Sequence, residues 1–308
     1  MPETPLFWEI ASLDTEKKNP ATENIDLATT TEVLEMISNQ DMLVADAVRS
    51  QLPYISTAVD TIVDSFRRGG RLFYFGAGTS GRLGIVDAAE CPPTFGTPPD
   101  MVQGIIAGGS QAVFQAQEGA EDDPNNGSRK VIELGISPPD IVCGLAASGR
   151  TPFVRGALDE AARRGVFTIL IATVSRDLIA GLGVKADVII CPDVGPEVIA
   201  GSTRMKSGTA QKLVLNMIST AAMIQLGKTY GNIMVDLQQT NAKLKERSKR
   251  ILMNLTGVDY DSAEKYLTDS KGNVKAALVM ILAGVDLAAA ESLLARAGGF
   301  VRRAIELK

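Results

Sequence analysis

The 308-residue chain contains no histidine, so any catalytic groups must come from other residue types. Histidine is the commonest general base and the usual partner of serine and cysteine nucleophiles, and those systems are excluded here. Two glutamates are the strongest candidates for proton transfer. Glu90 precedes a Cys-Pro-Pro sequence, and Glu121 lies in the acidic run 118–123. A carboxylate pair is the simplest acid–base system that such a chain can build.

Each glutamate also has an ordinary interpretation. A single Glu is usually solvated at the surface, and an acidic run is typical of a loop. The apolar neighbours of Glu90, however, predict a buried carboxyl group whose pKa is raised by desolvation. Because both acids follow adjacent strand–helix units, we expect them to face one pocket.

A glycine-rich loop before Glu90 has the composition of an anion site. The apolar run 72–75 predicts a buried strand, and residues 83–89 predict a helix. Free backbone N–H groups and the positive end of the helix dipole converge at such a helix N-terminus, where they favour a phosphate. The loop contributes three glycines and two hydroxyl groups: Gly76, Gly78, Gly81, Thr79 and Ser80.

The three glycines also match the dinucleotide pattern G-x-G-x-x-G, so a nicotinamide site has to be considered. Such a site needs an acidic residue at the end of the second strand, where this chain has Ala-Gly-Gly-Ser at 107–110. The loop is not followed by a Walker lysine, which argues against nucleoside triphosphate hydrolysis. A second hydroxyl-bearing loop, with Ser148, Gly149 and Thr151, follows the third predicted strand. Two such loops at one sheet edge favour phosphate binding over a simple helix cap.

Five apolar runs alternate with helical patterns and predict the sheet that holds these loops. Strands that are apolar on both faces are typical of a parallel sheet covered on two sides, so we predict an α/β fold. Such sheets bind ligands at the carboxyl ends of their strands, where the Gly/Ser/Thr-rich loops fall. The predicted strands span residues 72–75, 102–107, 141–146, 166–172 and 188–191.

Helical patterns lie on either side of the predicted sheet in the sequence. A helix that Thr31 caps is expected to begin at Glu32, and Pro53 marks a kink or a break before a second one. Residues 213–225 and 235–252 predict two further helices. We expect residues 1–250 to form the main domain with an N-terminal helical arm.

The last part of the chain, residues 251–308, predicts a small three-helix bundle. Its helices have plausible N-caps at Asp259 or Asp261, Asn273 and Asp286. The bundle lacks chemically distinctive residues, so packing or dimerisation is its expected role.

Composition narrows the choice of partners and compartment. The net charge of −5 argues against nucleic acid or an anionic membrane as a partner. The opening Met-Pro-Glu-Thr-Pro has no secretory signal pattern, and three widely spaced cysteines suit a reducing cytoplasm without a zinc site. We expect a soluble cytoplasmic enzyme that uses no metal and no cofactor.

Four segments together resemble the N-acetylmuramic acid 6-phosphate etherase family: residues 76–96, 118–122, 147–152 and 195–212. The last segment resembles a signature that this family shares with the glucokinase regulatory protein. The likeness covers nearly the whole chain, including Asn241 and the closing Gly298-Gly299-Phe300. Several long motifs in one order are far more specific than the glycine loop alone.

The resemblance implies a sugar isomerase (SIS) fold with a flavodoxin-like five-stranded sheet. It also implies a homodimer with sites near the subunit interface, and a small sugar phosphate as the ligand. The family's acid in Ala-Glu-Cys-Pro matches Glu90, and its second catalytic glutamate matches Glu121. The C-terminal bundle is similar to ubiquitin-associated-type modules. The signature adds candidate substrate-binding residues: Glu197, Ser202, Arg204 and Lys206. The alternatives for Glu197, Arg204 and Lys206 are that they line the pocket from the same subunit, that they line it from the neighbouring subunit, or that they order the loop.

The activity implied is cleavage of the D-lactyl ether of N-acetylmuramate 6-phosphate in cell-wall sugar recycling. The products are N-acetylglucosamine 6-phosphate and D-lactate. Ring opening to an aldehyde makes the C2 hydrogen acidic, so Glu121 is assigned as the base that removes it. Glu90 then protonates the departing lactate oxygen, although the residues alone do not fix which glutamate is the acid.

Two alternatives come from other classes of protein. A regulator similar to the glucokinase regulatory protein would sense sugar phosphates without turnover, but its extra length and second SIS-type unit are missing here. A ketose–aldose phosphate isomerase would use the same fold and a carboxylate base.

Overall fold

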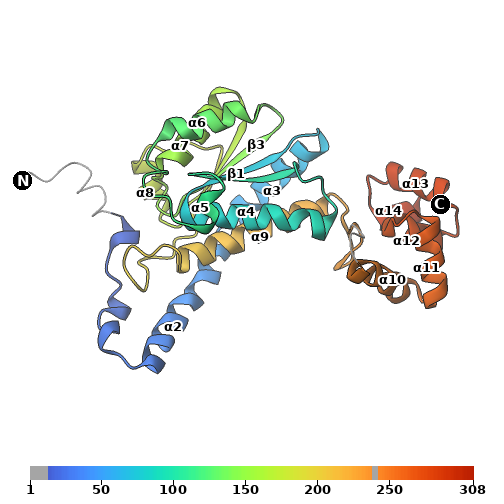
Figure 1. Ribbon diagram of the computed structural model, residues 1–308, viewed down its shortest axis with the longest axis horizontal. Coiled ribbons are helices and arrows are strands. Elements are labelled where there is room, and N and C mark those ends of the chain that lie inside the picture. Colours follow the sequence, from blue (N-terminus) through green and yellow to red (C-terminus); the bar gives the residue numbers. More distant parts are fainter. Residues whose placement is uncertain (1–12, 238–241) are drawn as a thin grey trace, which may run out of the picture. The chain divides into compact units, whose positions relative to one another are not determined.

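The structure is a computed structural model that describes residues 13–237 and 242–308 (Figure 1). Its contacts divide the chain into two compact units, described separately below. The sheet unit contains the chain up to Ala88 together with Asp100–Ile218. The helical unit contains Ala89–Pro99 and Ser219–Lys308. The predicted boundary between residues 250 and 251 falls inside helix α10 (Ala242–Thr256).

The sheet unit is built on a five-stranded parallel sheet in the order β2-β1-β3-β4-β5. This is the flavodoxin-like order, which confirms the predicted fold class. The chain direction switches at β1, which lies between β2 and β3, so the loops after β1 and β3 emerge side by side. The strands are β1 (Leu72–Gly76), β2 (Val102–Ile106), β3 (Ile141–Leu145), β4 (Phe167–Ile171) and β5 (Val188–Ile190).

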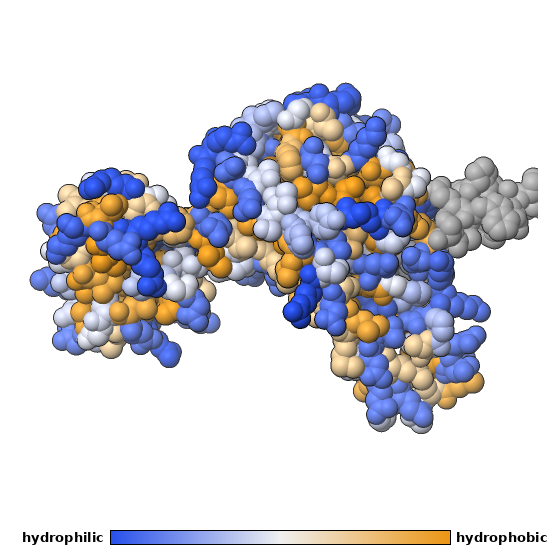
Figure 2. All heavy atoms as spheres, turned by 180° about the vertical axis from the view of Figure 1, so that it is seen from behind, coloured by the Kyte–Doolittle hydropathy of each residue, from blue (hydrophilic) through white to orange (hydrophobic). Residues whose placement is uncertain are grey.

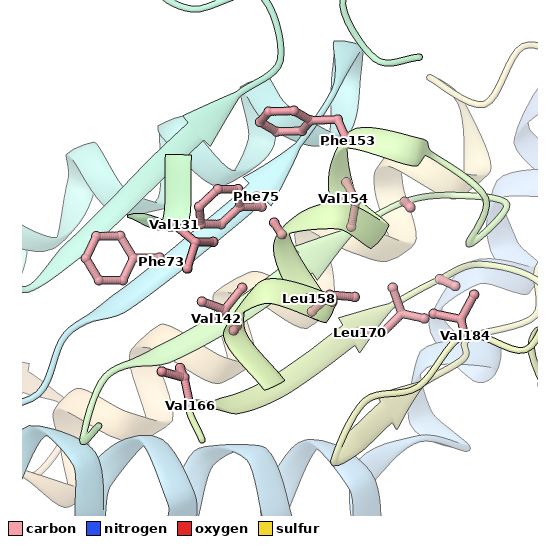
Figure 3. Packing of buried hydrophobic residues seen from close by; sticks show 14 of the residues in the cluster. Phe73, Phe75, Val131, Val142, Phe153, Val154, Leu158, Val166, Leu170 and Val184 are labelled. Atoms are coloured by element: carbon pink, nitrogen blue, oxygen red, sulfur yellow. The ribbon is translucent and has the colours of Figure 1, made fainter. Parts of the chain in front are cut away.

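One face of the sheet packs against helices α6 (Pro124–Glu133) and α7 (Pro152–Arg163), as Figure 3 shows. Alternate residues of each strand point to this face, because side chains in a strand alternate between its two sides. Burying each large side chain stabilises the fold by about 1.5–3 kcal/mol. The strand residues in this cluster include Phe73, Phe75, Val142 and Leu170, and the helix residues include Val131, Phe153, Val154 and Leu158.

The opposite face is covered in part by α4 (Gly78–Phe95). Gly84 lies against Tyr74, and the Tyr74 hydroxyl donates a 3.0 Å hydrogen bond to the buried Asp87 carboxylate. This helix is longer than the predicted span 83–89, because it continues through Pro92 and Pro93. Both prolines lie in the final turn, where each removes an N–H donor to the carbonyl four residues earlier, and the helix ends two residues later at Phe95.

The N-terminal arm consists of short 3₁₀ turns followed by α2 (Thr30–Arg49) and α3 (Leu52–Arg67). The break that Pro53 predicted is present between the two helices. The first helix starts two residues earlier than expected, because Thr29 and Glu32 form a capping box. The 3₁₀ turns are Asp14–Glu16, Pro20–Thr22 and Ile25–Leu27.

The remaining helices of the sheet unit are α5 (Gln111–Phe114), α8 (Arg176–Gly181) and the start of α9 (Lys206–Gln225). Helix α5 is only four residues long. In Figure 1, α6 and α7 lie on one side of the sheet while α4 and α9 lie on the other.

The helical unit contains a small hairpin, β6 (Thr229–Tyr230) and β7 (Ile233–Met234). The predicted caps are confirmed: Asp259, Asn273 and Asp286 each accept a backbone N–H three residues on. The last helix, α14, follows the three predicted ones. The helices after α10 are α11 (Tyr260–Asp269), α12 (Val274–Ala283), α13 (Leu287–Arg296) and α14 (Val301–Glu306).

The helix predicted over 235–252 begins later, at Ala242, and Asn241 lies outside the described residues. In the described part of the chain, no single helix has the length and apolar character needed to cross a membrane. Helices α12 and α13 meet those requirements only as a pair, which is bent by 103°.

Candidate active site

The loop between β1 and α4 has the tight geometry that its glycines predict. A Cβ on Gly81 would lie 2.6 Å from the Ile106 side chain and 2.8 Å from the Gly76 carbonyl oxygen, so only glycine fits there. Helix α4 then begins at the exposed Gly78, and the partly buried Thr79 and Ser80 occupy its first turn. The structure therefore contains the strand, the glycine-rich loop and the open helix N-terminus that the sequence predicted for an anion site.

The start of α9 packs against this loop. The Ser80 hydroxyl donates a 2.8 Å hydrogen bond to Oε1 of Gln211, and a Cβ on Gly208 would lie 3.4 Å from the Thr79 methyl group. Two buried polar atoms of α9, Ser207 Oγ and Gln211 Nε2, have no hydrogen-bond partner among the described residues. Sequence reasoning missed both side chains.

The second hydroxyl loop, residues 148–151, connects β3 to α7. Thr151 is the N-cap residue of α7, but within the described chain its side chain makes no capping hydrogen bond. Ser148 Oγ accepts a long 3.4 Å hydrogen bond from the backbone N–H of Arg150, with Gly149 between them. The side-chain cap proposed as the ordinary interpretation of this loop is therefore absent at Thr151.

Glu121 is joined to this second loop through the backbone. Its carbonyl oxygen accepts a 3.0 Å hydrogen bond from the Phe153 N–H, in the first turn of α7. Helices α6 and α7 cross in direct backbone contact. A Cβ on Gly127 would lie 1.9 Å from the Phe153 carbonyl oxygen, and one on Gly156 would lie 1.9 Å from that of Pro124. The position of Glu121 is thus tied to the start of α7.

A pocket of about 240 Å³ lies beside the first loop, and Glu121 lines it. Although the residue as a whole is exposed, desolvation of its carboxyl group raises the pKa of Glu121, and the adjacent charge of Asp122 raises it further. The other lining residues come from the start of α4, the end of β2 and the segment after it: Ala77, Gly78, Arg82, Ala107, Ala112, Ala116, Gln117, Glu118, Gly119 and Ala120.

Arg82 is a pocket residue that sequence reasoning missed. Its Nε donates a 2.9 Å hydrogen bond to the carbonyl oxygen of Val113 in α5. The available signal was its position directly after Gly81 and one helical turn after Gly78, where a side chain remains close to the helix N-terminus.

Glu90 does not have the burial that its sequence neighbours predicted, because its side chain is exposed. It is not among the residues that line the pocket. Glu90 lies on α4 12 positions after Gly78, in the part of this helix that belongs to the helical unit. Its helix neighbour Val86, at i−4, is 46% exposed, so this face of α4 is open in the single chain.

Glu197 and Lys206 are both buried, at 0% and 1% exposure, and both make hydrogen bonds within the chain. The Glu197 carboxylate accepts 2.9 Å hydrogen bonds from the backbone N–H groups of Lys206 and Ser207, at the start of α9. The Lys206 ammonium donates to the Val194 carbonyl at 2.7 Å and to Gln40 at 3.0 Å. Burial lowers the pKa of Lys206, while the Glu197 charge opposes that change.

This network anchors the N-terminal arm to the loop before α9. The Asn19 amide donates to the Pro196 carbonyl, and the Thr22 hydroxyl donates to that of Val198. Ser202 is partly buried and Arg204 is exposed on the same loop. The loop that carries these two candidate residues is therefore held in place by Glu197 and Lys206.

Proteins of known name match this chain along nearly its whole length. The chain is 56% identical over 302 residues to an N-acetylmuramic acid 6-phosphate etherase of Salinibacter ruber, covering 98% of this chain and 96% of that protein. It is 50% identical to the same-named protein of Mesorhizobium japonicum, covering 99% and 98%. The chain belongs to the N-acetylmuramic acid 6-phosphate etherase family. The resemblance expected from the four sequence segments is thus confirmed.

A second comparison concerns the domain type. Residues 54–162, from α3 to α7 of this etherase family member, match the family described as glucokinase regulatory protein N-terminal SIS domain. Among solved structures, the chain is similar to a putative phosphosugar isomerase from Bacteroides fragilis, with 17% identity and a TM-score of 0.47. That similarity covers 64% of this chain and 91% of the other.

Proposed function

We propose that this chain cleaves the D-lactyl ether of N-acetylmuramate 6-phosphate, as a carbon–oxygen lyase. The products are N-acetylglucosamine 6-phosphate and D-lactate. Membership of the etherase family supports this reaction over a regulator without turnover and over a sugar-phosphate isomerase. The structural observation that carries it is Glu121, a carboxylate of raised pKa in a pocket beside an open helix N-terminus.

The two hydroxyl loops are the proposed phosphate site. Phosphate is favoured at the N-terminus of α4, where N–H groups are unpaired and the dipole is positive. The loops after β1 and β3 emerge from adjacent parallel strands, so both can reach one phosphate. The proposed contacts are Gly78, Thr79 and Ser80 from the first loop, and Ser148, Gly149 and Thr151 from the second.

Glu121 acts in this scheme as the general base. In the open-chain aldehyde the C2 proton is acidic, and the ionised carboxylate removes it. The ether bond at C3 then breaks, and the departing lactate oxygen takes a proton from the second acid, Glu90. Water adds at C3 of the unsaturated aldehyde, with Glu90 now ionised as the base, and the C2 position regains its proton from Glu121.

A homodimer is part of the proposal, with the site near the subunit interface. Glu90 and Val86 share an exposed face of α4, so a second copy that covers this face would desolvate Glu90. Helix α2 carries further exposed apolar side chains, including Leu34, Met42 and Leu43. In Figure 2, hydrophobic atoms are visible on the arm that contains this helix.

The loop before α9 has a supporting role in this proposal. Glu197 and Lys206 fix its shape, and Ser202 and Arg204 are the side chains placed to contact substrate. A cytoplasmic role in cell-wall sugar recycling is proposed as well. The three cysteines, Cys91, Cys143 and Cys191, form no disulfide in the described residues, as a reducing compartment allows.

One assay separates the proposed activity from its alternatives. The protein is incubated with N-acetylmuramate 6-phosphate, and D-lactate is measured together with the sugar products. Stoichiometric release of D-lactate and N-acetylglucosamine 6-phosphate is expected. Binding without turnover would indicate a regulator, and interconversion of ketose and aldose phosphates without lactate would indicate an isomerase.

A further inference from the structure

The pocket beside Glu121 contains an arginine that the scheme above leaves without a role. Arg82 enters the pocket from α4, and its Nε donates a 2.9 Å hydrogen bond to the Val113 carbonyl oxygen. That bond uses only one of the five N–H donors of the guanidinium group. It fixes the plane of the group at the pocket wall and leaves the two terminal NH₂ groups for a ligand.

The charges of the pocket residues favour an anionic ligand at Arg82. The lining residues all lie in the described part of the chain, and among them Arg82 is the sole cation while Glu118 and Glu121 are the acids. Within the described residues, neither acid forms an ion pair with it. An arginine fork matches a carboxylate with two parallel hydrogen bonds, which a lysine cannot reproduce.

The proposed substrate brings a carboxylate to this position. The C2 proton and the C3 ether are on bonded carbon atoms, and the lactyl carboxylate is attached one carbon beyond the ether oxygen. A base that reaches the C2 proton therefore has the lactyl group in the same pocket. A carboxylate placed beside Glu118 and Glu121 without a cation would be strongly disfavoured.

The geometry points to Arg82 as the residue that binds the lactyl carboxylate and so determines specificity for the acid ether. This inference rests on the proposed function. In this arrangement the two anionic groups of the substrate bind at different places. The phosphate lies at the hydroxyl loops, and the carboxylate lies at Arg82. Sugar phosphates that lack an acidic substituent at C3 make no contact with Arg82 and do not gain this ion pair.

The test compares two substrates in the wild-type protein and three variants. The substrates are N-acetylmuramate 6-phosphate and the same molecule with its lactyl carboxylate converted to a primary amide. Arg82→Gln should lower kcat/KM for the acid by about 10- to 100-fold, with a change of less than about threefold for the amide. Arg82→Lys keeps the charge but loses the planar guanidinium fork. Its kcat/KM for the acid should lie between that of the wild-type protein and that of Arg82→Gln. Arg129→Gln removes a charge from the exposed surface of α6 and should change neither value.

Two further measurements keep the inference separate from the proposed function. Calorimetric binding of N-acetylglucosamine 6-phosphate, which has phosphate but no lactyl group, should be unchanged in Arg82→Gln, and urea unfolding should report a folded protein. Equal losses on acid and amide, or weakened binding of the product, would overturn the carboxylate assignment while the etherase activity stands. If the wild-type protein releases no D-lactate at all, the proposed function fails and the inference fails with it.

Discussion

The Ser80 hydroxyl lies 2.8 Å from Oε1 of Gln211, a residue 131 positions later in the chain. This hydrogen bond joins the first turn of α4 to α9. As oriented, the Gln211 amide accepts the only proton of the hydroxyl and leaves its own Nε2 without a partner among the described residues. A 180° turn of the amide would let Nε2 donate to Ser80 Oγ, and the Ser80 proton could then be given to a phosphate oxygen.

The Ser80–Gln211 pair makes a kinetic prediction. Ser80→Ala should raise KM for N-acetylmuramate 6-phosphate by about tenfold or more with little change in kcat, because one hydrogen bond to a charged group is lost. Gln211→Glu can only accept, and its charge repels the phosphate, so KM should rise further. Thr61→Ala removes a hydroxyl of α3 that bonds only to the Thr57 carbonyl, and serves as the control. An unchanged KM in both site variants would show that the phosphate binds elsewhere.

The pKa of Glu121 predicts the acid limb of the pH profile. A general base must be ionised, so kcat/KM should fall as the pH drops through the pKa of Glu121. Desolvation and the Asp122 charge both raise that pKa, which places the midpoint above the value of an ordinary Glu. Asp122→Asn removes one of the two causes, lowers the pKa and moves the limb to lower pH.

The control for this profile is Asp60→Asn, which removes an equal charge from the exposed side of α3. Its profile should overlay that of the wild-type protein. An acid limb that stays in place in Asp122→Asn, or moves to higher pH, would show that another group controls it.

Loss of the Glu197 hydrogen bonds is predicted to lower the stability of the fold. Glu197→Ala leaves two backbone N–H groups of α9 unpaired and removes the charge nearest the buried Lys206, so we expect a loss of about 2–4 kcal/mol in the free energy of unfolding. Urea denaturation measures it. Glu133→Ala, which removes an exposed ion pair with Lys130, should cost less than about 0.5 kcal/mol. Wild-type stability combined with a raised KM would instead make Glu197 a direct substrate contact.

The proposed interface predicts complementation between two inactive variants. Glu90→Gln and Glu121→Gln should each abolish D-lactate release. If each site takes Glu90 from one subunit and Glu121 from the other, a mixed dimer retains one intact site. Unfolding and refolding an equimolar mixture should then restore about one quarter of wild-type turnover, since half of the dimers are mixed. Both variants refolded alone are the controls, and an inactive mixture would place the two acids in one subunit.

The sheet could be predicted because its signal is local. Each strand is a short apolar run ended by glycine or a polar turn, and the order of strands and helices favours parallel pairing. The hydroxyl loops followed from the same reasoning, since the carboxyl ends of adjacent strands share one edge. The length of α4 did not follow, because a proline usually marks the end of a helix, whereas α4 continues through Pro92 and Pro93 to Phe95.

The environment of individual side chains could be predicted less well. Glu90 follows the buried Ala88 in sequence, but a helix advances about 100° per residue, and Glu90 shares its face with the exposed Val86 instead. Lys206 is charged and therefore expected at the surface, yet long-range hydrogen bonds to Gln40 and Val194 keep it buried. Contacts between residues so far apart in the sequence leave no local pattern.

The crossing of α6 and α7 sets a dimension of the candidate site. Gly127 and Gly156 let the two main chains touch without side chains between them, and the Phe153 N–H then reaches the Glu121 carbonyl. Backbone contacts, and not side chains, consequently set the distance between the proposed base, Glu121, and the second anion loop. Redesign of this scaffold for a longer or shorter sugar would have to begin at these two glycines, because exchanging the residues that touch the ligand would leave that span unchanged.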